Sequence, residues 1–157
     1  LTSASAGRGM SAAPATTEED EMPHSVEDKL AINELVSRYN MAMDHVQAAD
    51  WAATFTEDGE LVIDGKSIAK GRAALTAMVE NAAKGTYRGR HWVCNAIIDG
   101  EGDTARLRMY VLSFGIIDGI TPRVMGEYDD VLVRVKGEWK FKTRNITFVA
   151  GKSGIVK

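Results

Sequence analysis

A change of period near Tyr87 is the feature of the sequence that most constrains the fold. From there on apolar and polar side chains alternate, and three turns rich in Gly and Asp divide the rest into four segments. Alternation predicts strands, and turns between successive strands predict an antiparallel meander. The expected strands are 88–98, 104–115, 123–135 and 138–149. A sheet of this kind has one face to cover, so the residues before it must supply that cover.

The first part of this cover is a helix with an apolar stripe. Between residues 26 and 46 apolar side chains recur at spacings of three and four, which places them on one side of a helix. Ser25 and Asp28 have the spacing of a capping box, so we expect both side chains to accept backbone N–H groups at the start of this helix. The stripe consists of Val26, Leu30, Ile32, Leu35, Val36, Tyr39, Met43 and Val46.

A second, shorter helix should follow. Asp50 is its predicted N-cap, and the helix is expected to run through Trp51 and Phe55 and to end at the Asp58-Gly59 turn.

A hairpin and a third helix complete the first half of the chain. Residues 60–63 and 66–69 are predicted to be short strands, joined by an Asp-Gly dipeptide of the kind that favours a two-residue turn. Residues 71–83 have apolar side chains at helical spacing, and Gly85 occupies the usual position after a helix end.

These elements predict one α+β domain over residues 24–150, with three helices followed by a curved antiparallel sheet that folds over them. The concave interior of such a sheet is a usual place for a small ligand. Residues 1–23 are rich in Ala, Ser, Thr and acidic side chains, so we expect a disordered tail. Because Met10 could be a native start, one interpretation of residues 1–9 is a cloning remnant; residues 151–157 are expected to be a second tail.

The composition is that of an ordinary globular protein and narrows the function. With 157 residues, 45% hydrophobic residues and a net charge of −3, the chain has no basic stripe, so we expect no nucleic-acid partner. No apolar run reaches the roughly 20 residues of a membrane span. The single cysteine, Cys94, can form neither an internal disulfide nor a zinc site made of cysteines. We therefore expect a cytoplasmic protein without a membrane partner.

The spacing of apolar and polar residues does not decide which polar side chains belong to a functional site. Asp44 lies roughly 120–140° around the helix from the centre of the stripe, which favours solvent exposure over a site. His91 and Asn95 fall on the same face of a strand, either toward the concave interior or as hydrogen-bonded core residues. Arg144 either faces the cavity or belongs to a solvated face. No histidine pair has the spacing of a metal site.

Five segments carry a resemblance to a known family. They are INELVSRYNMAMD, DWAATFTEDGELVI, KGRAAL, GRHWVCNAIIDGEGDTARLRMYVL and GEYDDVLVRVKGEWKFKTRNITF. Their order resembles the SnoaL-like group of the nuclear transport factor 2-like (NTF2-like) superfamily, which includes scytalone dehydratase, bile-acid 7α-dehydratase and hexachlorocyclohexane dehydrochlorinase. The resemblance implies a cone of curved sheet closed by helices. In these enzymes an Asp late in the first helix pairs with a His that opens a strand, and in the bile-acid enzyme a Tyr stands five residues before the Asp.

The matching positions here are Tyr39, Asp44 and His91. By this resemblance His91 is a general base, Asp44 orients its imidazole, and Tyr39 donates to a carbonyl or a departing oxygen. The expected substrate contacts are Asn95, Arg144, Trp51, Phe55 and Met109.

The resemblance also implies a reaction class and an assembly. We expect a lyase of the dehydratase type or a double-bond isomerase, without cofactor or metal, that acts on a small hydrophobic cyclic substrate such as a steroid, polyketide or terpenoid. A homodimer or homotrimer is expected. The alternatives are a small-molecule-binding protein that keeps the fold without catalysis, and a hydrolase or cyclase of the same superfamily.

Overall fold

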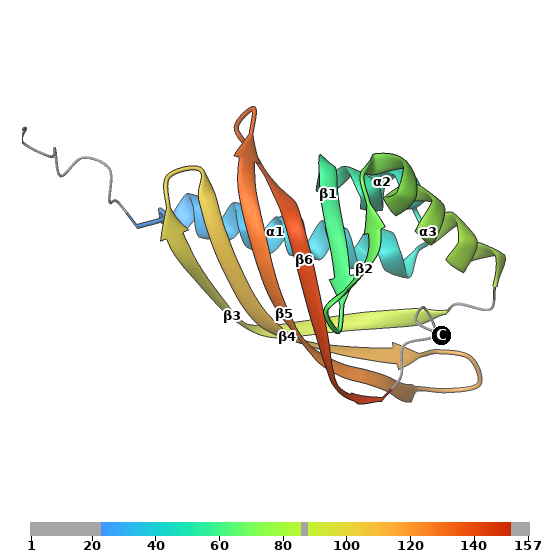
Figure 1. Cartoon of the computed structure of the whole chain (residues 1–157). Helices are drawn as coiled ribbons and strands as arrows, with labels where there is room; N and C mark the ends of the chain where they lie inside the picture. Colours follow the sequence, from blue (N-terminus) through green and yellow to red (C-terminus); the bar gives the residue numbers. More distant parts are fainter. Residues whose placement is uncertain (1–22, 86–87, 152–157) are drawn as a thin grey trace, which may run out of the picture.

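A mostly antiparallel sheet curves around one long helix in the computed structural model, which describes residues 23–85 and 88–151 (Figure 1). The helices of the described part are α1 (Val26–Asp44), α2 (Ala48–Ala53) and α3 (Arg72–Lys84). Its strands are β1 (Phe55–Ile63), β2 (Lys66–Lys70), β3 (Gly89–Glu101), β4 (Thr104–Gly115), β5 (Thr121–Val135) and β6 (Glu138–Gly151). Of the expected tails 1–23 and 151–157, residues 1–22 and 152–157 lie outside the described residues. Pro23 forms an isolated bridge with Glu101, and Gly151 ends β6. The fold class agrees with the α+β prediction.

The sheet has the strand order β2-β1-β6-β5-β4-β3. Strands β3 to β6 form the predicted antiparallel meander, and β4 has the predicted bounds. The prediction of a purely antiparallel sheet is wrong at one pair, because β1 lies parallel to β6. This pairing joins the short N-terminal hairpin to the meander, so all six strands of the described residues share one curved sheet.

Strand β1 begins earlier than predicted. The second helix ends at Ala53, Gln47 is its N-cap and Asp50 lies in its first turn, so the predicted capping by Asp50 and the helical assignment of Phe55 are wrong. The expected turn at 58–59 is instead an irregular stretch of the strand, where the register with β6 shifts. A Cβ at Gly59 would lie only 2.8 Å from Phe55 Cβ, so the absence of a side chain permits this close approach.

The start of α1 is rotated relative to its predicted stripe. Val26 and Leu30 are 78% and 68% exposed, because the opposite side of the first turn faces the sheet. There Asp28 accepts hydrogen bonds from Arg134 on β5 (2.7 Å) and from Trp139 on β6 (3.2 Å). The remaining apolar positions of the stripe are buried or half-buried against the core.

Half of the predicted capping box is present. The Ser25 hydroxyl accepts the Asp28 N–H at 3.1 Å, but the Asp28 carboxylate accepts the Ser25 hydroxyl and not its backbone N–H. The predicted Asp64-Gly65 turn is confirmed, with φ values of 48° and 76° that match the hairpin turn favoured by Asp-Gly. The predicted third helix is confirmed as α3, which packs against α2, β1 and β2.

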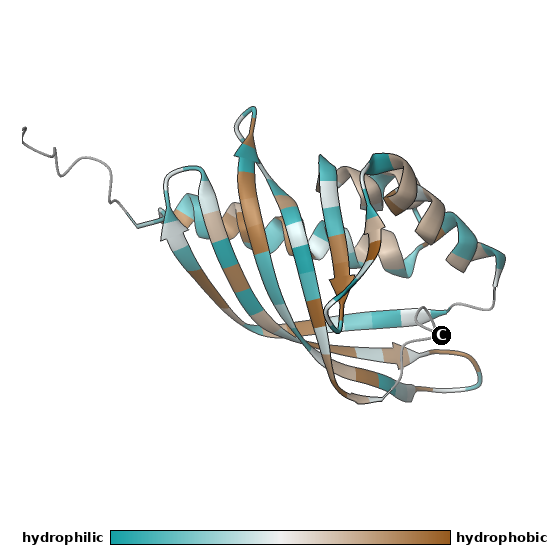
Figure 2. Ribbon diagram, viewed as in Figure 1, coloured by the Kyte–Doolittle hydropathy of each residue, from teal (hydrophilic) through white to brown (hydrophobic). Residues whose placement is uncertain are grey.

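The core lies between α1 and the concave face of the sheet. Hydrophobic and hydrophilic residues alternate along the strands, as the coloured bands in Figure 2 show. The bulkiest apolar side chains that are fully buried are Trp51, Phe55, Phe141, Ile32, Leu75, Leu107 and Leu132. At the other end of the concave face, the ends of β4 and β6 and the beginning of β5 hold half-buried side chains such as Ser113, Phe148 and Val124.

Candidate active site

The Asp44 carboxylate binds His91 twice. Asp44 Oδ1 lies 2.6 Å from the ring atom Nδ1, and Oδ2 accepts the His91 backbone N–H at 3.1 Å. The side chains are 4% and 17% exposed. The expected contact between these two residues is therefore present.

Asp44 occupies the last position of α1, where the helix dipole disfavours a carboxylate by about 0.3–1 kcal/mol. The last turn of this helix holds no basic residue. The carboxylate is stabilised instead by its two hydrogen-bonding contacts with His91. The prediction from the helical period that Asp44 is exposed to solvent is wrong. Only 8% of Asp44 is exposed, because the beginning of β3 crosses the end of α1.

His91 lies in a cross-strand row on the concave face. It is opposite Ser113 on β4, which is opposite Val124 on β5. Opposite residues of antiparallel strands point to the same face, so these three side chains are neighbours. All three are half-buried, and His91 Nε2 makes no hydrogen bond to a described residue. This nitrogen is available to a substrate.

Coverage of the concave face increases with distance from His91. The row that contains Met109, Tyr128, Ile146 and Ile63 lies four residues deeper, about 13 Å at 3.3 Å per residue. Ile146 is half-buried, and the other three are at most 5% exposed. Between the two rows lie Val93 and Phe148, which are half-buried and apolar. The site is therefore a partly open apolar surface with one acid–imidazole pair at its rim.

Tyr39 belongs to the buried aromatic core between α1 and the sheet. Its ring packs against Trp51, Phe55 and Phe141 with centroid distances of 5.2, 5.9 and 5.5 Å. Burial raises the pKa of the Tyr39 hydroxyl, so the phenol remains protonated and a potential donor. The Arg144 guanidinium carbon lies 4.1 Å from the centre of the Tyr39 ring.

Arg144 forms a buried ion pair with Asp130. Its Nε and Nη2 donate to Asp130 Oδ2 at 3.0 and 2.7 Å, and both residues are 0% exposed, so the solvated-face alternative for Arg144 is wrong. Rings of Tyr128 and Phe141 lie 3.9 and 4.1 Å from the guanidinium carbon. Burial raises the pKa of Asp130 to about 6 although the guanidinium opposes the rise, and the carboxylate raises the pKa of Arg144. Both groups are charged at neutral pH.

The fold agrees with comparisons to known proteins. A family model described as a SnoaL-like domain matches residues 24–145. The chain belongs to this SnoaL-like family. Comparison with curated protein sequences gives no significant match.

Solved structures place this SnoaL-like domain in the NTF2-like, cystatin-like fold. An NTF2-like protein with a cystatin-like fold from Novosphingobium aromaticivorans is 27% identical, with a TM-score of 0.71, and 84% of this chain and 90% of that one are covered. A Mycobacterium tuberculosis protein of unknown function is 30% identical, with a TM-score of 0.74 and coverage of 78% and 72%. A proposed scytalone dehydratase from N. aromaticivorans is 25% identical, with a TM-score of 0.69 and coverage of 80% and 86%.

Other predicted contact residues of the SnoaL-like domain are separated from His91. Trp51 and Phe55 are 0% exposed and Met109 is 5% exposed, so these side chains are core residues beneath the partly open surface. Asn95 is exposed, and its predicted position on the face of His91 is wrong. A bulge between Cys94 and Ile97, where Asn95 has a φ of 59°, reverses the alternation along β3.

Two polar residues near Asp44 and His91 in the structure were missed in the sequence. Ser113 lies beside His91 because of the register between β3 and β4. The predicted antiparallel pairing of these two strands was the signal that could have identified it. Asn40 is 5% exposed and lies one helical turn before Asp44. Its spacing of four residues from Asp44 was the signal that could have identified it.

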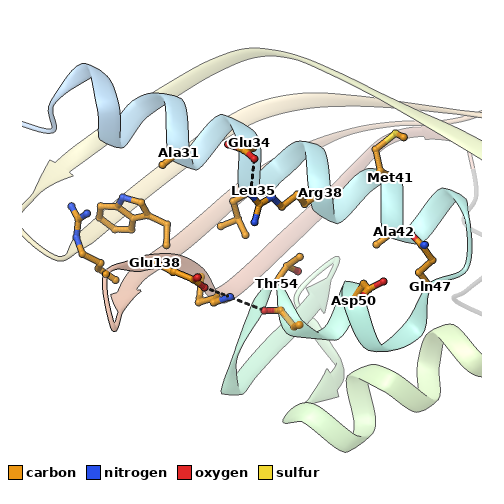
Figure 3. Close-up of a pocket in the computed structure, with 15 residues that line it drawn as sticks. Ala31, Glu34, Leu35, Arg38, Met41, Ala42, Gln47, Asp50, Thr54 and Glu138 are labelled. Carbon is orange, nitrogen blue, oxygen red and sulfur yellow. Dashed lines mark hydrogen bonds and ion pairs between the residues drawn. The ribbon is translucent and has the colours of Figure 1, made fainter.

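A separate groove lies on the outer side of α1 (Figure 3). It has a volume of about 600 Å³ and runs between α1, α2 and the end of the β5–β6 hairpin. Charged pairs such as Glu34–Arg38 and Glu138–Lys140 line it, but Asp44 and His91 do not.

The described part of the SnoaL-like domain holds neither a metal-binding cluster of side chains nor a membrane-spanning helix. Across residues 23–85 and 88–151, His, Cys, Asp and Glu form no group of three or more that could hold a metal ion. In the same part of the chain, no helix is long and apolar enough to cross a membrane.

Proposed function

We propose that the protein is a lyase or double-bond isomerase of small hydrophobic cyclic compounds, with His91 as the general base. The observation that carries the proposal is the 2.6 Å contact between Asp44 Oδ1 and His91 Nδ1. A carboxylate at Nδ1 holds the proton on that nitrogen and leaves the lone pair of Nε2 free to accept another. The similarity to the proposed scytalone dehydratase supports the reaction class.

The proposed elimination uses protein groups alone. Nε2 removes a proton from the carbon next to a substrate carbonyl, and Asp44 stabilises the resulting imidazolium. The C–H electrons form the new double bond as hydroxide leaves the β-carbon, and the imidazolium returns the proton to the hydroxide. The products are an unsaturated ketone and water. In the isomerase alternative, the imidazolium returns the proton to another carbon.

Tyr39 is the proposed donor to the substrate oxygen. Its hydroxyl stays protonated because burial raises its pKa, and its ring lies in the aromatic core beneath the apolar surface. The half-buried apolar side chains of Val93 and Phe148 are suited to a hydrophobic ring system.

Turnover of 3-hydroxy-1-tetralone tests the proposal. This bicyclic β-hydroxyketone loses water and becomes 1-naphthol, which is followed by fluorescence. We expect His91→Gln and Asp44→Asn to lower kcat/KM by about 10²- to 10⁴-fold, the usual contribution of a general base. His45→Gln is the matched control, because His45 is exposed and its Nδ1 lies 2.8 Å from the Met41 carbonyl oxygen.

Other outcomes separate the alternatives. Equal activity of His91→Gln and wild type would contradict the general-base role. Conversion of 5-androstene-3,17-dione to the conjugated ketone would favour the isomerase, and incorporation of water into a product would favour the hydrolase. Binding of these compounds to both wild type and His91→Gln without turnover would favour a binding protein.

We also propose a cytoplasmic homo-oligomer that associates through the convex face of the sheet. Trp92, Tyr110 and Met125 are 68%, 50% and 48% exposed on three neighbouring strands. Trp92 and Met125 flank Leu112 in one cross-strand row, so their apolar surfaces are continuous. A patch of this kind supports self-association.

A further inference from the structure

Asn40 has an amide group with no hydrogen-bond partner. The residue is 5% exposed, and neither Nδ2 nor Oδ1 contacts a donor or acceptor of any described residue. Buried amides are nearly always hydrogen-bonded, and an unsatisfied one destabilises a folded protein. Packing alone therefore gives no reason for asparagine at this position of α1.

The position of Asn40 relates it to the acid–imidazole pair. Asn40 and Asp44 are four residues apart on α1, so their Cβ atoms lie on the same side of the helix, about 5–6 Å apart. Asp44 uses this side to bind His91 on β3. The Asn40 amide therefore lies one helical turn from the carboxylate that holds His91.

We propose that Asn40 is the polar anchor of the site and donates a hydrogen bond from Nδ2 to the substrate carbonyl next to the carbon that His91 deprotonates. This inference rests on the proposed function and specifies its substrate class as cyclic ketones. Negative charge develops on the carbonyl oxygen when the neighbouring carbon loses its proton. A fixed amide donor at that oxygen stabilises the enolate more strongly than the ketone.

The stability of Asn40→Leu gives a test that needs no ligand. Leucine has nearly the shape of asparagine but no polar atoms, so we expect an unchanged or higher melting temperature. A clear fall in the melting temperature would show that the amide stabilises the fold, which would overturn the inference.

The matched probes 1-tetralone and tetralin test the hydrogen bond itself. They share a bicyclic carbon skeleton, but only 1-tetralone has a carbonyl. We expect wild type and the control His45→Gln to bind the ketone roughly 2- to 12-fold more tightly, the effect of one hydrogen bond of ordinary strength. In Asn40→Leu this preference should disappear. A preference that persists in Asn40→Leu, or failure of 1-tetralone to bind wild type, would overturn the inference.

Activity distinguishes this inference from the proposed function. If wild type converts 3-hydroxy-1-tetralone and Asn40→Leu keeps both the ketone preference and full activity, only the role of Asn40 fails. If the preference disappears in Asn40→Leu but wild type has no activity, the carbonyl anchor is supported and the proposed lyase is contradicted.

Discussion

Replacement of Arg144 by methionine should destabilise the fold strongly. Arg144 is the partner of the Asp130 carboxylate, and both side chains are 0% exposed. Methionine fills much of the same space and retains contact with the surrounding rings, but it leaves the carboxylate buried without its cation. The change therefore isolates the loss of charge pairing more cleanly than alanine would.

The expected loss is about 3–5 kcal/mol of unfolding free energy, the range for a buried pair that loses one partner. Against a typical total of 5–15 kcal/mol, this is a large fraction. The double variant Arg144→Met/Asp130→Leu should recover most of the loss, because it removes both charges. Arg106→Met is the control. Arg106 also donates two hydrogen bonds to an aspartate, Asp129, but this pair is 57% and 49% exposed and should contribute about 0–1 kcal/mol.

The loss in Arg144→Met should also depend on pH. Without the guanidinium, the pKa of folded Asp130 rises further above its wild-type value of about 6, whereas the unfolded value stays near the ordinary 3.8. A raised folded pKa means that the contribution of this group is fully present below the unfolded pKa and is lost as pH rises through the folded pKa. The variant should therefore be more strongly destabilised at pH 8 than at pH 5.

Urea unfolding followed by tryptophan fluorescence measures both effects, because Trp51 lies in the same aromatic cluster. The reasoning would be refuted if Arg144→Met had no larger effect than Arg106→Met, or if its effect were equal at the two pH values.

Three further changes have defined outcomes. Asp28→Ala should lower stability by about 0.5–1.5 kcal/mol, because the carboxylate accepts hydrogen bonds from Arg134 and Trp139. Since Arg134 lowers the pKa of Asp28, the loss measured by urea unfolding should shrink as pH falls below the ordinary value of 3.8. Gly126→Ala should lower stability by about 1–3 kcal/mol, since its Cβ would lie 2.9 Å from the Thr147 carbonyl oxygen, and an unchanged denaturation midpoint would contradict this. Trp92→Lys should shift the proposed oligomer toward monomer in analytical ultracentrifugation, whereas an unchanged sedimentation coefficient would place the interface elsewhere.

The meander was predicted well because each of its strands pairs with the next one along the chain through a short turn. Alternation and turn residues identified β3 to β6, and the Asp64-Gly65 dipeptide identified the hairpin. The parallel pairing of β1 with β6 joins segments about 80 residues apart. The spacing of side chains within either segment does not indicate such a distant partner. Phe55 was assigned to a helix because the apolar spacing of a short segment does not distinguish a helix end from a strand start.

The site was predictable to a smaller extent. The helical period alone favoured an exposed Asp44, since burial there depends on a strand that begins more than 40 residues later. The family resemblance supplied the pairing with His91. Asn95 was misplaced because a bulge breaks the two-residue period on which its orientation depended. Arg144 was a poor candidate for burial until Asp130 was known to lie against it.

The two bonds from Asp44 to His91 make one carboxylate responsible for both architecture and chemistry. One oxygen fastens the main chain of β3 to the end of α1, and the other restrains rotation of the imidazole. A substitution at Asp44 therefore changes both at once, whereas a substitution at His91 removes the ring and leaves the main-chain fastening in place. In the course of evolution, a descendant can lose the imidazole and still retain the aspartate for its role in folding. Retention of the aspartate alone is consequently weaker evidence of activity in a relative than retention of the histidine.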